Sequence, residues 1–118
     1  MAGAMTLDGQ NIMLGITFPQ APKANYSYNF ASRKLTSWVT PSVPEIDLKK
    51  FVSSTLEFYP NREGIKIPMF VRRPPQCANK TCPVVVHFHG GPEGQSVPGF
   101  SPFLQMFVDE GFVFVEPN

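Results

Sequence analysis

Cysteine and histidine are scarce in this sequence, with two of each among 118 residues. Cys77 and Cys82 stand in a C-x4-C spacing that is neither a redox nor a zinc signature. A bridge across so short a loop is compatible with disulfide geometry if the loop turns back like a hairpin. A disulfide would favour a periplasmic or secreted location and two free thiols the cytoplasm, and the sequence leaves both open. Two triplets match N-glycosylation acceptors, a pattern that also occurs often by chance: Asn25-Tyr26-Ser27 and Asn79-Lys80-Thr81.

An excess of charge of one sign is also lacking. Ten basic residues face nine acidic ones, which gives a net charge of +1. This balance offers no electrostatic case for binding nucleic acid or an anionic membrane surface. The longest apolar run is far shorter than the roughly 20 residues of a membrane span. We therefore expect neither nucleic acid nor a membrane as a partner.

Hydrophobic residues are plentiful, at 42% of the chain, and 11 residues are phenylalanine. This content suffices for a buried core and argues against disorder. Thirteen prolines predict frequent loops rather than long helices. The length leaves room for one small domain or for parts of two.

The chain is organised around a strand and a glycine turn that begin after Cys82. The apolar, β-branched run 83–88 is typical of a strand buried on both faces. It leads into residues 89–95, where consecutive glycines allow a sharp turn and leave N–H groups uncovered.

A helix and a second strand follow this turn. Ser101 fits a helix N-cap, Pro102 fits the first helical position, and Gly111 fits the C′ position that ends a helix. Residues 112–115 form another buried-strand run. The two strands and the helix together predict a right-handed βαβ unit with parallel strands.

The chain before this unit reads as β structure. Residues 1–5 are small and featureless, and we interpret them as a remnant of cloning rather than as part of the fold. Alternating apolar residues in 10–18 and 26–39 predict antiparallel strands. Two prolines in 40–50 indicate a domain connection with one short helical turn. Residues 51–71 predict a hairpin.

Two stretches, VVVHFHGGPEGQ and GFSPFLQMFVDEGFVFVEPN, resemble the start of the α/β-hydrolase domain of the prolyl oligopeptidase family of serine peptidases. Upstream, DGQNIMLGITF, a proline loop and NYSYNFASRKLTSWV resemble the last blade of the β-propeller that precedes that domain. The resemblance implies an α/β, β-rich fold. Antiparallel propeller-blade-like strands would occupy residues 6–42, and the N-terminal part of an α/β-hydrolase sheet would occupy residues 43–118.

The resemblance also implies a function, that of a fragment of a serine peptidase that hydrolyses peptides through an acyl-enzyme. In the family, a histidine-glycine-glycine-proline turn helps to form the oxyanion hole. This role maps onto the backbone N–H of Gly91, with Gly90 and His89 setting the geometry of the turn. The family's nucleophile, acid and histidine follow this turn, so we expect the triad to lie beyond Asn118 and this chain alone to be inactive.

Other candidate residues fit catalysis or metal binding poorly. Ser96 and Ser101 both lack the second glycine of the G-x-S-x-G nucleophile elbow. His87 and His89, one residue apart on a strand, would face the same side as two metal ligands do, but only Glu93 lies nearby to complete a site. We therefore predict no metal site and no cofactor.

Two other functions stay open on the sequence. A related esterase would use a similar glycine turn, and a non-enzymatic β-rich interaction module would use the turn only structurally. A G-x-S-x-G motif shortly after Asn118 would favour an enzyme. A fragment of this kind would expose sheet edges and an apolar face, which predicts self-association or strand swapping.

Overall fold

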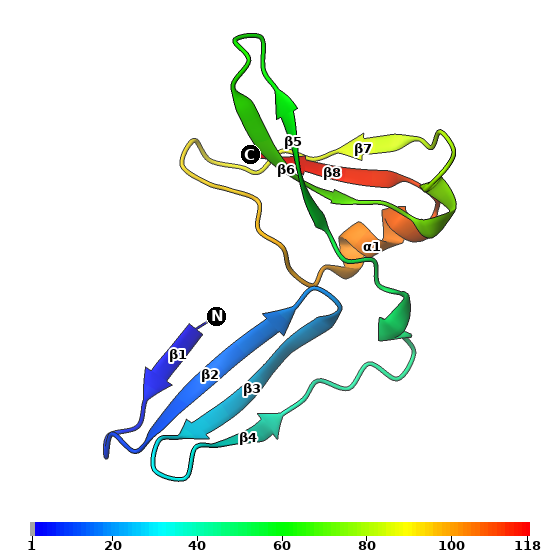
Figure 1. The fold of residues 1–118 in the computed structure, drawn as a ribbon. Coiled ribbons are helices and arrows are strands. Elements are labelled where there is room, and N and C mark those ends of the chain that lie inside the picture. Colours follow the sequence, from blue (N-terminus) through cyan, green and yellow to red (C-terminus); the bar gives the residue numbers. More distant parts are fainter. Residues whose placement is uncertain (1) are drawn as a thin grey trace.

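The computed structural model describes residues 2–118, which form two separate four-stranded sheets (Figure 1). The first sheet is antiparallel and keeps chain order: β1 (Ala2–Met5), β2 (Asn11–Phe18), β3 (Ala21–Asn29) and β4 (Lys34–Val39). The second is mixed, in the order β5-β6-β8-β7: β5 (Thr55–Pro60), β6 (Lys66–Arg72), β7 (Val84–Val86) and β8 (Val113–Pro117). One helix, α1 (Pro102–Asp109), lies against the second sheet. The β-rich α/β fold class is confirmed.

The first four described residues belong to the fold. Ala2–Met5 form β1, which pairs antiparallel with β2 in a register that places Met5 opposite Ile12. The expectation that residues 1–5 lie outside the fold is therefore wrong for the described part of this stretch. Small residues at positions 2–4 are no obstacle to pairing, because the ladder uses backbone groups alone. Met1 lies outside the described residues.

The turn between β1 and β2 is held by a carboxylate. Asp8 Oδ1 accepts hydrogen bonds from the hydroxyl of Thr6 (2.6 Å) and from the backbone N–H of Gln10 (2.9 Å). These bonds favour the ionised form, so the pKa of Asp8 is lowered, chiefly by the Thr6 hydroxyl. Gly9 has a φ of +67°, which suits a residue without a side chain.

The first sheet is a single layer. Of its residues whose burial the structure describes, only Ala24 is buried, and all six residues of β4 are exposed. Trp38 keeps 67% of its surface exposed while its indole N–H donates to the Ser27 hydroxyl. Neither face of this sheet is covered by another part of the described chain. A sheet in this situation needs a further layer of structure to bury its apolar residues.

The connection between the sheets includes a short helical turn, as predicted, over Leu48–Lys50. It is fixed to α1 through Gln105, whose Oε1 accepts from the Val52 N–H (2.9 Å) and whose Nε2 donates to the Lys50 carbonyl (3.3 Å). Beside it, the ring of Phe51 stacks on that of Phe100 with centroids 4.7 Å apart. The segment is thus packed against the helix.

The predicted order of strand, helix and strand and the parallel pairing of the two strands are confirmed. β7 and β8 are parallel, with Val85 opposite Phe114, and α1 connects them. The Ser101 hydroxyl accepts from the Leu104 N–H at 3.4 Å, as an N-cap does, and Gly111 has a φ of +88° just after the helix.

The second sheet has two buried clusters, one around Val71, Cys77 and Val113 and the other where the helix meets β8. Leu104 and Val108 pack against Phe114, which is 1% exposed. Full burial of a phenylalanine ring contributes about 1.5–3 kcal/mol.

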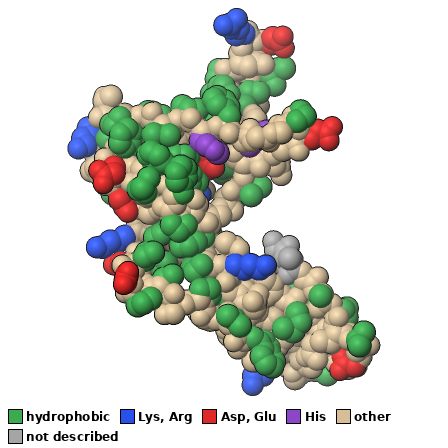
Figure 2. Space-filling model, turned by 180° about the vertical axis from the view of Figure 1, so that it is seen from behind, with side chains coloured by type: hydrophobic (Ala, Val, Ile, Leu, Met, Phe, Trp, Pro, Cys, Tyr) green, Lys and Arg blue, Asp and Glu red, His purple; other side chains and the backbone are tan. Residues whose placement is uncertain are grey.

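The prediction that the 83–88 strand is buried on both faces is wrong. β7 spans only three residues, and Val84 and Val86 are 54% and 51% exposed. The physical reason is the alternation along the strand, because Val85 packs against the cluster that α1 covers and its two neighbours therefore point to the opposite face, where they stay exposed. Further apolar surface is open nearby at Phe88 and Phe103. Figure 2 shows hydrophobic side chains gathered on the lobe that contains this sheet.

No helix among residues 2–118 is both long and apolar enough to cross a membrane.

Candidate functional site

The glycine turn follows the carboxyl end of β7 and starts at His89. Gly91 has a φ of +73°, in the left-handed region that favours glycine, and an added Cβ would meet no atom within 4 Å. Within residues 2–118, the N–H groups of Gly90 and Gly91 donate to no protein acceptor. The turn thus carries backbone donors that are free to bind a negatively charged oxygen.

The turn is closed by contacts within itself. The ring nitrogen Nδ1 of His89 lies 3.3 Å from the Gly90 carbonyl oxygen. A Cβ added at Gly94 would lie 2.9 Å from that same oxygen and 3.1 Å from His89 Nδ1. Glycine at position 94 therefore allows the chain to return close to the start of the turn.

A buried ion pair fixes the loop between the turn and α1. The guanidinium of Arg72 on β6 bonds to the carboxylate of Glu116 on β8, and their side chains are 5% and 11% exposed. Arg72 Nη2 also donates to the Gly99 carbonyl at 3.0 Å. The pair satisfies the charge of each partner and ties the loop to two strands of the sheet.

The residue that follows β8, Asn118, anchors the same loop at a second position, Ser96. Asn118 Oδ1 accepts from the backbone N–H of Ser96 at 2.5 Å, and Asn118 Nδ2 donates to the Ser96 carbonyl at 3.1 Å. The Asn118 amide thus bonds both the N–H and the C=O group of Ser96. This is the same pair of bonds that a residue on a neighbouring strand would form, and it fixes the position of Ser96. The turn is therefore carried by a loop anchored at Ser96 and at Gly99.

Sequence reasoning missed three of these anchoring residues: Arg72, Glu116 and Asn118. A signal was present for Glu116, because a carboxylate inside the apolar run 112–117 needs a buried cation nearby. Its partner could not be read from sequence, since Arg72 lies 44 residues away.

The predicted site residues lie together in the turn, and the serines considered as nucleophiles have other contacts. Ser101 caps α1, and Ser96 is held by Asn118 through its backbone. His87 lies near Phe114, with ring centroids 6.1 Å apart, and in the described part of the chain neither histidine is hydrogen-bonded to a serine. Residues 2–118 contain no group of three His, Cys, Asp or Glu side chains placed to hold a metal ion. In the described residues, the arrangement therefore consists of free backbone N–H donors in the glycine turn.

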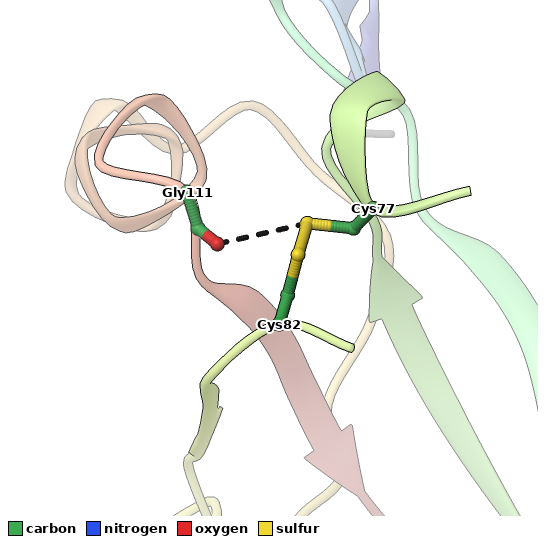
Figure 3. The surroundings of a disulfide bond; sticks show 3 residues. All are labelled: Cys77, Cys82 and Gly111. Carbon is green, nitrogen blue, oxygen red and sulfur yellow. Dashed lines mark hydrogen bonds between the residues drawn. A yellow bond between two sulfur atoms is a disulfide. The ribbon is translucent and has the colours of Figure 1, made fainter. Parts of the chain in front are cut away.

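The two cysteines form a disulfide at the other end of β7 (Figure 3). It closes a loop with a sequence separation of 5 between Cys77 and Cys82. The Cys77 sulfur lies 3.6 Å from the carbonyl oxygen of Gly111, and because a disulfide sulfur carries no hydrogen this is a packing contact. The bridge thus joins the end of β6, the start of β7 and the end of α1.

Several solved structures contain a segment with the fold of this chain. Prolyl oligopeptidase B from Galerina marginata, bound to a 25mer macrocyclization substrate, matches with a TM-score of 0.78 and 25% identity over 99% of this chain. Puromycin hydrolase matches with a TM-score of 0.80 and 17% identity over 98% of this chain. A puromycin-hydrolyzing peptidase of Mycobacterium tuberculosis matches over 93% of this chain, with a TM-score of 0.77 and 17% identity.

This chain spans 17%, 19% and 18% of the lengths of those three proteins, in the same order. No protein-family model and no curated protein sequence matches it.

Proposed function

Because this chain has the fold of one segment of the prolyl oligopeptidases and puromycin hydrolases, we propose that it is the oxyanion-side segment of a serine peptidase. Its substrates would be peptides, attacked through an acyl-enzyme. The observation that carries the proposal is Gly91, which follows a parallel strand with a left-handed φ and a free N–H. In α/β folds, ligands bind outside the carboxyl ends of the strands, where this turn lies.

The separation of the chain into two sheets supports the division that we propose. Residues 6–42 would be the last blade of a β-propeller, which is consistent with a single antiparallel layer that lacks cover on both faces. Residues 43–118 would form the first part of an α/β-hydrolase domain. Strand β1, which starts at Ala2, would then extend the blade segment toward the N-terminus.

In the proposed mechanism, the turn stabilises charge that develops during acyl transfer. A serine of the complete peptidase would attack the peptide carbonyl, whose oxygen becomes negative as the tetrahedral intermediate forms. The Gly91 N–H would donate to that oxygen, while His89 and Gly90 would hold the turn in shape. One such donor contributes roughly 10²–10³-fold in rate. This chain alone would be inactive, because it would lack the nucleophile, base and acid.

Labelling of the nucleophile by a fluorophosphonate probe tests this function. We expect no label on the 118-residue chain and one label on a chain extended past Asn118 with its natural sequence, read by intact mass. Label on the short chain would contradict the proposal and point to Ser96 or Ser101, which Ser96→Ala and Ser101→Ala would separate. Absence of label on the folded extended chain would instead favour an interaction module.

We also infer that the isolated segment self-associates. The support is the exposed apolar surface on and after the edge strand β7, at Val84, Val86 and Phe88. An edge strand of this kind pairs readily with another chain. Sedimentation velocity should show species larger than the monomer, and Val86→Lys should shift them toward the monomer. A monodisperse monomer with a cooperative melt would rule this out.

A further inference from the structure

The loop closed by the disulfide carries an asparagine acceptor triplet, Asn79-Lys80-Thr81. All three residues are exposed. In the described part of the chain, neither the Asn79 amide nor the Thr81 hydroxyl forms a hydrogen bond to another protein group. Both groups that a transferase must reach are therefore accessible and unengaged.

We propose that Asn79 is an N-glycosylation site and that this protein passes through an oxidising secretory compartment. The disulfide between Cys77 and Cys82 supports the second part independently of the triplet, because disulfides persist in secreted proteins and are rare in the cytosol. N-linked glycans are attached in that same pathway to exposed Asn-x-Ser/Thr triplets. The bridge and the acceptor thus indicate one compartment.

The modification is a transfer from a lipid-linked diphospho-oligosaccharide. The Nδ2 atom of Asn79 forms a bond to the anomeric carbon of the first sugar. The bond from that carbon to the diphosphate oxygen breaks, and its electron pair leaves with the lipid diphosphate. One proton from Nδ2 passes to a base of the transferase, so the product amide keeps a single N–H.

The second triplet, Asn25-Tyr26-Ser27, is a poorer site, although Asn25 itself is exposed. It lies inside β3, which pairs with β2 on one side and β4 on the other. Its hydroxyl is engaged, because Ser27 Oγ accepts from the Trp38 indole at 2.7 Å. We expect this site to stay unmodified.

A glycan on Asn79 would leave the glycine turn free. The disulfide loop precedes β7, whereas the turn follows it, so the two lie at opposite ends of the same strand. The contact of Cys77 with Gly111, just before β8, places the loop at the amino ends of both parallel strands. The modification is thus compatible with chemistry at their carboxyl ends.

The test is peptide mapping of the natural protein isolated from its source. Peptide N-glycosidase in heavy-oxygen water should convert Asn79 to a labelled aspartate and leave Asn25 as asparagine. An unmodified Asn79 in this protein would overturn the proposal.

Variants of the natural full-length protein, secreted by a eukaryotic host, supply the matched controls. The glycosidase-sensitive shift in mass should be lost in Asn79→Gln and Thr81→Ala and kept in Thr81→Ser and Asn25→Gln. Because residues 79 and 81 are exposed, the changes at these two positions should leave the fold intact. A shift that survives Asn79→Gln and disappears in Asn25→Gln would also overturn the proposal. A reporter acceptor triplet added at the C-terminus shows whether the chain has met the transferase. Glycan on this reporter but none on Asn79 would also overturn the proposal.

Discussion

Arg72 and Glu116 form a buried ion pair that joins β6 to β8, and the same arginine holds the carbonyl of Gly99. Glu116 stands two residues beyond Phe114, the cross-strand neighbour of Arg72, so both charges lie on the face of the sheet that α1 covers. Two strands and the loop that carries the glycine turn thus meet at one guanidinium.

Arg72→Ala should lower the free energy of unfolding by about 3–5 kcal/mol, because it leaves the carboxylate of Glu116 buried without a partner. Arg73→Ala is the matched control. Arg73 bonds to Glu57 at 3.1 Å, but their side chains are 42% and 36% exposed, so a loss of at most about 1 kcal/mol is expected. Urea denaturation at low protein concentration measures both.

A double substitution separates two contributions to stability: the cost of leaving the Glu116 carboxylate buried alone, and the net stabilisation by the ion pair. Arg72→Met combined with Glu116→Leu should recover most of the stability lost in Arg72→Ala, since apolar replacements of a buried pair are often neutral. If the double variant is as unstable as the single one, the bond from Arg72 to Gly99 matters more than the ion pair.

Local features of this fold were predictable from the sequence. Ser101 caps α1 and Gly111 ends it, because both roles depend on backbone groups within a few residues. The parallel pairing of β7 and β8 followed from the strand-helix-strand spacing.

Features that depend on residues far apart in the sequence were not predictable in the same way. The apolar sequence of β7 predicted burial, but the burial of Val84 and Val86 depends on which strands and helices cover them. The anchoring of Ser96 by Asn118 joins residues 22 positions apart, and no local pattern specifies such a partner. Of the site, the glycine turn could be located from sequence, whereas the contacts that hold it could not.

Removal of the disulfide by Cys77→Ala with Cys82→Ala should lower the free energy of unfolding by about 2 kcal/mol. This figure follows from the chain entropy that so short a loop loses when it is closed. Alanine suits position 77 because Cys77 is buried. A reducing agent should destabilise the parent chain similarly and leave the double variant unchanged, and any effect on the variant would show that the reagent acts elsewhere.

Asp8 provides a prediction on pH. Its pKa is lowered from 3.8 in the folded chain, so the folded state holds this proton less tightly than the unfolded state does. The stabilisation is therefore fully present above the unfolded pKa and is lost as the pH falls through the folded pKa. An NMR titration of the Asp8 carboxyl should give a value below 3.8, and Thr6→Val should move it upward by removing the strongest bond. If the pKa of Asp8 is the same in Thr6→Val as in the original chain, the Gln10 N–H rather than the Thr6 hydroxyl lowers it.

Gly91→Ala should impair catalysis in a chain that contains the complete triad. Alanine at a φ of +73° costs about 1–2 kcal/mol, so the turn would relax and move its N–H away from the oxyanion. A fall in kcat of up to roughly 10²–10³-fold, with little change in KM, corresponds to loss of one donor that acts in the transition state. Gly64→Ala is the matched control for strain, because Gly64 has a φ of +81° and open space around it in the turn between β5 and β6. Equal losses of activity in the two variants would mean that Gly91 serves the fold alone.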